Sequence, residues 1–234
     1  MPQSDPTPST PTGLQVLDLS RRFGRRWVLA RVHLTLPAGS SCMLTGANGS
    51  GKTTMLRCIA TALKPHHGAI LFNGSDLWLQ RRAMRPSIAL LSHATRLYED
   101  LDAKGNLRTW ARLGGYKINA EELIERVGLP TDRRDAVRNY SAGMRRRLAL
   151  ARVLIKQPDL LLLDEPFTAL DPEGRQLVMD TVRTIQERGV TLLIATHLPQ
   201  VATAVCEHHV HMEYGRVETS TLESNTPPEP EPAT

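Results

Sequence analysis

The fold of this chain is decided by one stretch, Gly46-Ala47-Asn48-Gly49-Ser50-Gly51-Lys52-Thr53-Thr54. It matches the phosphate-binding pattern G-x-x-x-x-G-K-[ST]. Glycines allow a tight turn and let backbone N–H groups approach phosphate oxygens with no Cβ in the way. Lys52 is expected to place a cation on the terminal phosphates, and Thr53 is expected to bind Mg²⁺. The stretch therefore predicts a phosphate loop, residues 46–54, that holds ATP with magnesium.

The flanking residues predict a strand before the phosphate loop and a helix after it. Residues 41–45 can form a buried strand, and Met55, Leu56 and Ile59 recur at helical spacing. Pro65 is expected to stop that helix. The loop would then lie at a helix N-terminus, where the helix dipole favours an anion. The alternative is a glycine-rich turn with a chance lysine.

A second segment, far along the chain, argues against that alternative. Residues 160–163 are four consecutive leucines, followed by Asp164, Glu165 and Pro166. An unbroken apolar run of this length is typical of a central parallel strand covered on both faces. We expect Asp164 to hold magnesium through water and Glu165 to orient and deprotonate the attacking water. Either carboxylate alone could simply cap a strand end, but with a phosphate loop upstream the pair predicts ATP hydrolysis.

The rest of the pattern predicts an α/β fold. Strands are expected at residues 14–19, 32–36, 69–72, 87–91 and 190–195, and a helix from Asp171-Pro172 to Gly189. Alternating strands and helices indicate a mostly parallel sheet. The first two strands predict an N-terminal antiparallel β element, and an all-helical stretch from about 95 to 157 interrupts the alternation. The expected fold class is a phosphate-loop NTPase core with an inserted helical subdomain.

Length and composition bound the remaining possibilities. The 234 residues, 41% of them hydrophobic, suit one α/β domain, expected at residues 13–220. The proline-rich ends, 1–12 and 221–234, are expected to be disordered tails. No stretch approaches the roughly 18 apolar residues of a membrane span, and no signal peptide is expected. Because only 4% of residues are aromatic, we expect no nucleic-acid partner, and we interpret the basic run 145–147 as a solvated helix face.

Four further features, in this order along the chain, resemble those of ATP-binding-cassette proteins. They are an aromatic residue that stacks on adenine (Phe23), the signature (Tyr140-Ser141-Ala142-Gly143-Met144), the D-loop (Ala169-Leu170-Asp171) and the switch histidine (His197). With the phosphate loop and the 160–166 segment, the resemblance covers residues 13 to 218. It implies an ATPase whose helical subdomain carries the signature.

The resemblance also implies a shared site. Two such domains face head to tail as a homodimer, and each of two ATP molecules lies between the phosphate loop of one and the signature of the other. Ser141 and Gly143 would contact the γ-phosphate across the interface, and His197 would contact it from within the same subunit. The signature departs from the common L-S-G-G-Q, since Ala142 replaces a glycine and Met144 a glutamine. On residue chemistry alone, Ser141 is a helix N-cap.

His93 is a further departure from the common pattern. It follows the strand at 87–91, where the family usually has a glutamine in the loop that senses magnesium and meets the membrane partner. With S-A-G in the signature, this histidine is similar to the ATP-binding subunit of the haem exporter of cytochrome c maturation. Imidazole is a poorer magnesium ligand than oxygen, so His93 is expected to act mainly by hydrogen bonding. The alternative is a surface or capped histidine.

The sequence therefore predicts an ATP-hydrolysing subunit that drives a permease on a separate chain, at the cytoplasmic face of the inner membrane. Haem export is the expected task. The nearest alternative is export of a drug, lipid or peptide. Two other classes remain: a non-transport cassette protein acting on ribosomes or DNA, and a small-molecule kinase. The signature, the D-loop and His197 argue against the kinase.

Overall fold

A mostly parallel sheet, whose inner strands are buried, forms the centre of the molecule. The computed structural model describes residues 13–222. The sheet has the order β10-β9-β3-β8-β7-β6, with β9 to β6 parallel and β10 antiparallel to β9. Its strands are β3 (Ser41–Thr45), β6 (Ile88–Leu91), β7 (Leu160–Asp164), β8 (Thr191–Ala195), β9 (His208–Glu213) and β10 (Arg216–Ser220). Every residue of β3, β7 and β8 is buried, which confirms the prediction of a strand covered on both faces.

A second, antiparallel sheet comes from the N-terminal part of the chain. It has the order β2-β1-β4-β5, formed by β1 (Leu14–Phe23), β2 (Arg26–Leu36), β4 (His67–Phe72) and β5 (Ser75–Asp76). Val16 lies opposite Leu34, so the alternating apolar residues share one face. Both residues pack into one core cluster with Leu44 of β3 and Leu56. This sheet is the predicted antiparallel element, and it joins the central sheet through that core.

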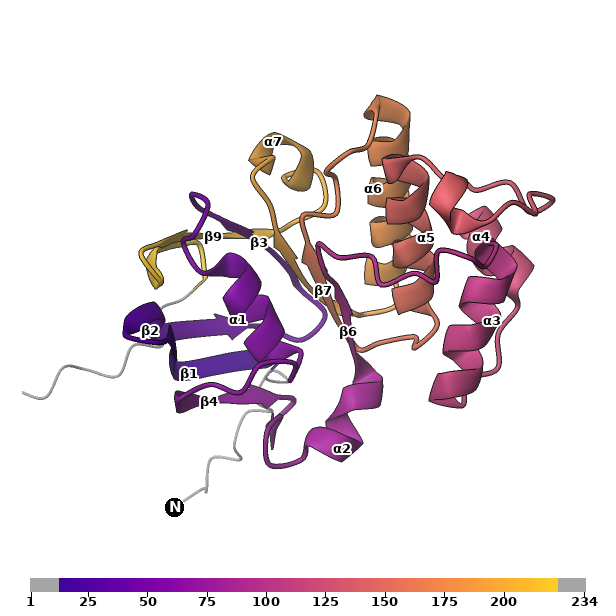
Figure 1. The fold of residues 1–234 in the computed structure, drawn as a ribbon. Coiled ribbons are helices and arrows are strands. Elements are labelled where there is room, and N and C mark those ends of the chain that lie inside the picture. Colours follow the sequence, from indigo (N-terminus) through magenta and orange to yellow (C-terminus); the bar gives the residue numbers. More distant parts are fainter. Residues whose placement is uncertain (1–12, 223–234) are drawn as a thin grey trace, which may run out of the picture.

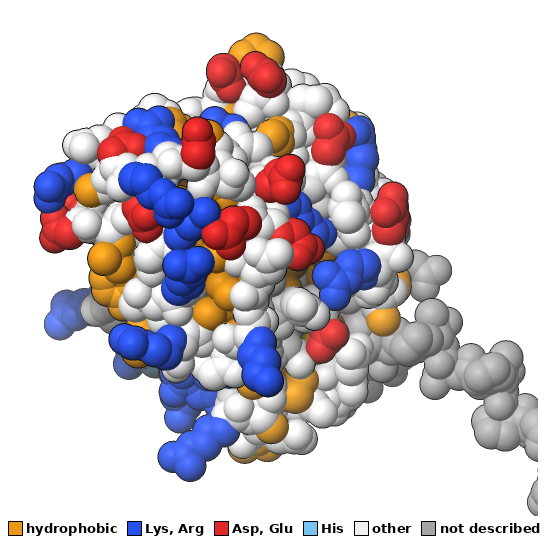
Figure 2. Space-filling model, turned by 90° about the vertical axis from the view of Figure 1, so that its right-hand side faces the viewer, with side chains coloured by type: hydrophobic (Ala, Val, Ile, Leu, Met, Phe, Trp, Pro, Cys, Tyr) orange, Lys and Arg blue, Asp and Glu red, His pale blue; other side chains and the backbone are white. Residues whose placement is uncertain are grey.

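Helices fill the stretch between β6 and β7, as expected. The α-helices of residues 13–222 are α1 (Lys52–Ile59), α2 (Arg81–Met84), α3 (Ala103–Gly114), α4 (Ala120–Arg126), α5 (Ala142–Leu154), α6 (Pro172–Gln186) and α7 (Pro199–Ala202). Figure 1 shows α3, α4 and α5 together on one side of the parallel sheet, away from β1, β2 and β4. The face on that side carries interspersed basic and acidic side chains with hydrophobic ones between them (Figure 2).

Side chains accept hydrogen bonds at the starts of four helices. Asp102, Asn119, Ser141 and Asp171 each accept from the backbone N–H three residues ahead. These caps satisfy amide groups that lack a partner in the first turn. The local sequence therefore explains where the helices of the inserted segment, and α6, begin.

The structure differs from the sequence prediction at the C-terminal end of the fold. The sequence does not predict strands β9 and β10. In β9 only Val210 and Met212 are apolar and three of the other positions are histidines, and β10 has Val217 as its only apolar residue. Leu222 is buried in the core and the Thr221 N–H donates to His209 O, so the fold extends past residue 220. The expected tails at 1–12 and from 223 onward lie outside the described residues. Within residues 13–222, every helix is too short or too polar to cross a membrane.

Candidate functional site

The phosphate loop joins the end of β3 to the start of α1. Gly46, Gly49 and Gly51 all have positive φ, at 137°, 83° and 109°. A Cβ on Gly46 would clash with the carbonyl oxygen of Met212, and one on Gly51 would lie 2.8 Å from the oxygen of Val28. The loop therefore needs glycine for both its dihedral angles and its packing against neighbouring strands.

The groups inside the loop suit an anion. Lys52 is buried, and its Nζ donates to Gly46 O at 2.7 Å and to Ala47 O at 3.1 Å. Burial lowers the pKa of Lys52, and the neighbouring carboxylates of Glu165 and Asp164 oppose that shift. The buried hydroxyl of Ser50 has no hydrogen-bond partner among the described residues. A cation, an unpaired hydroxyl and the N-terminus of α1 therefore converge where phosphate is expected.

Two oxygen groups expected to bind magnesium are in direct contact. Thr53 Oγ1, at the start of α1, donates to Asp164 Oδ1, at the end of β7, at 3.0 Å. Asp164 is only 3% exposed. Burial raises the pKa of its carboxyl group, while the Thr53 hydrogen bond and the charge of Arg146 lower it. A hydroxyl beside a carboxylate is a donor set that Mg²⁺ prefers, so this pair fits the metal.

Glu165 lies beside His197, which is expected to be the switch histidine. Its backbone is left-handed, with φ 53°. Its N–H donates to Ala195 O at 2.8 Å, and its Oε2 lies 2.7 Å from His197 Nδ1. The adjacent strands β7 and β8 thus bring Asp164, Glu165 and His197 to one edge of the sheet. A carboxylate held this way can accept a proton from a water molecule.

The loop after β6 also reaches this edge. His93 is exposed, and its carbonyl oxygen accepts from Arg146 at 3.3 Å. The guanidinium of Arg146, from α5, donates to Ser92 O at 2.7 Å and to Glu165 O at 2.7 Å. The interpretation of residues 145–147 as a solvated face is therefore wrong for Arg146, which is 6% exposed. Arg146 precedes the buried Ala149 and Leu150 by three and four residues, a spacing that puts all three on one face of the helix. This spacing could have predicted that Arg146 is buried.

The signature does not join this cluster. Ser141 Oγ accepts from the Met144 N–H at 3.1 Å, as a helix N-cap does. A Cβ on Gly143 would lie 3.2 Å from Ala169 O, so the signature packs against the D-loop. In residues 13–222, no hydrogen bond links Ser141 or Gly143 to the phosphate loop. Phe23 lies at the end of β1, about half exposed, with the Arg21 guanidinium 4.9 Å from its ring centroid.

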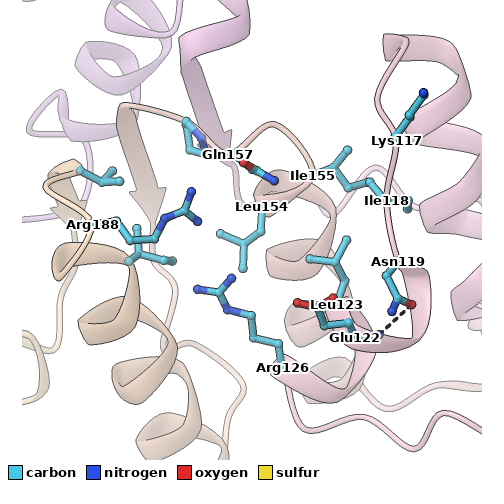
Figure 3. A pocket seen from close by; sticks show the side chains of 13 residues that line it. Lys117, Ile118, Asn119, Glu122, Leu123, Arg126, Leu154, Ile155, Gln157 and Arg188 are labelled. Atoms are coloured by element: carbon cyan, nitrogen blue, oxygen red, sulfur yellow. Dashed lines mark hydrogen bonds between the residues drawn. The ribbon is translucent and has the colours of Figure 1, made fainter.

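A separate cavity of about 130 Å³ lies elsewhere, between α4 and the C-terminal ends of α5 and α6. Figure 3 shows Arg126 and Arg188 on either side of Leu154 there. Its lining includes Pro158, just before β7, so it lies at the opposite end of that strand from Asp164. No residue expected to bind nucleotide lines it.

Comparison with known proteins finds a matching family model and similar chains. A family model described as "ABC transporter" matches residues 29–168. The daunorubicin resistance ATP-binding protein DrrA3 of Streptomyces coeruleorubidus is 37% identical over 211 residues, covering 88% of this chain and 67% of that protein. The Nod factor export ATP-binding protein I of Burkholderia lata is 34% identical over 204 residues, covering 85% and 67%.

A solved structure shows the same fold. It is a dimeric ATP-binding cassette in a post-hydrolysis state, bound to ADP and Pi. The superposition has a TM-score of 0.80 at 24% identity and covers 88% of this chain and 97% of the other. The expected fold class is therefore confirmed.

Proposed function

Because the chain belongs to the ABC transporter family, as a transport-type ATPase, we propose that it powers an exporter whose permease is a separate polypeptide. The relatives named for daunorubicin resistance and Nod factor export support export as the task. They favour the alternative that the sequence left open, export of a drug, lipid or peptide, over haem. Haem export rested on His93 and on Ala142 in the signature, and neither relative carries that function in its name.

One observation carries the ATPase role: the 3.0 Å hydrogen bond between Thr53 Oγ1 and Asp164 Oδ1. It joins the phosphate loop to the strand that ends in two carboxylates, 111 residues away. We propose that Thr53 and Asp164 hold Mg²⁺, which when bound neutralises phosphate charge. Lys52 and the loop amides bind the phosphates of ATP, and the ring of Phe23 stacks on the adenine.

In the proposed reaction Glu165 is the base. Its carboxylate accepts a proton from the attacking water, and His197 holds that carboxylate in place through the 2.7 Å contact. We also propose that the imidazole of His197 donates to the γ-phosphate. His93, on the loop after β6, hydrogen-bonds near the magnesium, directly or through water.

We further propose that two copies share each site. Ser141 and Gly143 of one copy complete the γ-phosphate site of the other. The proposal is supported by the absence of any hydrogen bond from these residues to the phosphate loop within residues 13–222. The similar solved cassette is dimeric, which also supports it. The permease then holds the dimer at the cytoplasmic face of the inner membrane, with the His93 loop toward it.

A deletion strain tests the transport role. Cells without the gene should accumulate more of a fluorescent drug such as daunorubicin, and a plasmid copy should reverse this while a Glu165→Gln copy should not. If drug accumulation stays unchanged and covalently haem-stained c-type cytochromes disappear instead, the substrate is haem. If both stay unchanged and the protein sediments with ribosomes, the transport role is wrong.

A further inference from the structure

The side chain of Arg146 joins three segments that sequence separates widely. It projects from α5, two residues after the signature, toward the ends of β6 and β7. Its Nη1 donates to Ser92 O at 2.7 Å and to His93 O at 3.3 Å. Its Nη2 donates to Glu165 O at 2.7 Å and also to Asp164 O. One planar group therefore spans the His93 loop and the end of the strand that carries both carboxylates.

The neighbouring arginines do something different. Arg145 Nη1 donates to Tyr140 O at 2.6 Å, and Arg147 Nη1 donates to Gly128 O at 2.7 Å. Both acceptors belong to the helical stretch between β6 and β7. Of the three consecutive arginines, Arg146 is the one whose contacts cross to the strands of the catalytic edge. The other two provide matched controls of the same chemistry.

A buried guanidinium at this place requires a reason. Arg146 is 6% exposed, and burial lowers its pKa, while the charges of Asp164 and Glu165 oppose that shift. A buried charge is costly unless hydrogen bonds satisfy it. Here the four carbonyl oxygens do so, although the buried Nε has no partner among the described residues. An apolar residue, such as the nearby Leu148 or Leu150, could fill this space equally well. The hydrogen bonds of the guanidinium are therefore the reason for an arginine at this position.

Those contacts bear on the conformation of Glu165. Its left-handed backbone is disfavoured for a residue with a Cβ and persists only where surrounding contacts hold it. Arg146 binds the carbonyl of Glu165 and the carbonyl before it, which orients both peptide groups of this turn. This backbone turn directs the Glu165 side chain toward His197.

We propose that Arg146 is a positioning residue, which couples the signature-bearing helix α5 to the hydrolytic carboxylates and to the His93 loop. The inference rests on the proposed roles of Asp164 and Glu165. Arginine is required because its rigid fork presents donors in two directions, whereas the single ammonium of lysine cannot bridge both pairs of carbonyls.

The test compares conservative variants of the three arginines in the full chain. Arg146→Lys and Arg146→Gln should each lower kcat roughly 10- to 100-fold, the scale expected for a catalytic group misplaced by about 1 Å. The dissociation constant for ATP should change less than about threefold, because the phosphate loop is untouched. Arg145→Lys and Arg147→Lys should keep both values within about twofold. If Arg146→Lys lowers ATP affinity and melting temperature as severely as kcat, or leaves kcat unchanged, the inference is overturned.

A double variant separates this inference from the role of Glu165. In a Glu165→Gln background, Arg146→Lys should cause almost no further loss of single-turnover rate, because residues acting through one group are non-additive. Fully multiplicative losses would show that Arg146 acts elsewhere. If Glu165→Gln alone keeps the parent rate, the assignment of the base is wrong. If Glu165→Gln loses the rate but Arg146→Lys does not, only the role of Arg146 is wrong.

Discussion

Glu165 Oε2 and His197 Nδ1 are 2.7 Å apart, and the backbone N–H of His197 donates to the same oxygen at 3.3 Å. The two residues follow adjacent parallel strands, β7 and β8, which place their carboxyl ends side by side. His197, in the loop after β8, therefore holds the carboxylate of Glu165 through both its backbone N–H and its imidazole. This relationship makes the two side chains one unit and leads to the first two predictions.

Replacing Glu165 by glutamine should remove the base and leave nucleotide binding intact. We expect turnover to fall by roughly two to four orders of magnitude, the usual contribution of general-base catalysis. The dissociation constant for ATP should stay close to that of the parent, and an ATP-bound dimer should accumulate on gel filtration. Glu187→Gln, an exposed carboxylate at the end of α6, is the control. Parent-like hydrolysis by Glu165→Gln would remove this residue from the role.

His197→Ala should release the Glu165 side chain from its position. We expect kcat to fall roughly 10- to 100-fold, as for other losses of catalytic alignment. In a Glu165→Gln background the further loss should be smaller than in the parent, since the contact of His197 with Glu165 acts through that carboxylate and only the proposed contact with the γ-phosphate remains. Steady-state ATPase assays of the two single variants and the double variant measure this. Losses that multiply fully would show that His197 does not act through Glu165.

Asp164→Asn should stabilise the nucleotide-free protein and weaken metal-dependent binding. Burial raises the pKa of Asp164 in the folded state, so the folded chain binds this proton more readily than the unfolded chain. Stability from this group therefore falls as pH rises from the unfolded pKa of about 3.9 through the raised folded pKa. At pH 7 the asparagine variant should melt above the parent, and the difference should vanish below about pH 4.

Two measurements check this prediction. Thermal melts over a pH series without nucleotide follow the stability, and ATP titrations with and without Mg²⁺ follow the metal site. Magnesium dependence that is unchanged in Asp164→Asn would contradict the metal assignment, whatever the melting temperature does.

Ser141→Ala should affect stability and activity together. The hydroxyl caps α5, so its loss should cost about 1 kcal/mol of stability. If Ser141 also completes the site of a second copy, hydrolysis should fall while ATP binding to the monomer stays unchanged. Asn119→Ala removes the equivalent cap of α4 at a similar cost in stability and is the matched control. Equal ATPase rates in the two variants would contradict the shared site.

The shared site also predicts how activity depends on protein concentration. Because one copy supplies the phosphate loop and the other the signature, specific activity should rise with concentration until the dimer saturates. Dilution series of the purified chain, with sedimentation to follow assembly, measure this. A specific activity that stays flat where the protein is monomeric would rule out a site made from two copies.

His93 can be tested by two replacements. His93→Gln should keep substantial ATPase activity, because an amide oxygen can serve magnesium or its water. His93→Ala should lose much more, since it can neither bind nor donate. Rates measured over a range of Mg²⁺ concentrations compare the two. If the alanine variant matches the glutamine variant at every concentration, His93 is a surface residue without a role in hydrolysis.

The amino-acid sequence by itself determined the parts of this protein that depend on local rules. The phosphate loop follows from glycines at positions that need positive φ, and the buried strand β7 follows from four consecutive leucines. The caps at Asn119 and Asp171 set where α4 and α6 begin. In each case the physical cause lies within a few residues of its effect.

Only the tertiary structure decided how distant segments meet. Strand β9 beside β3, the contact of Glu165 with His197, and the burial of Arg146 between two strand ends all depend on strand order and helix packing. Arg145, Arg146 and Arg147 are identical as residues, and their environments differ because α5 turns one side chain in three toward the sheet. The helical spacing of Arg146 from Ala149 and Leu150 indicates which of the three arginines faces the sheet. Only packing between distant segments brings the carbonyl groups after β6 and β7 to its guanidinium.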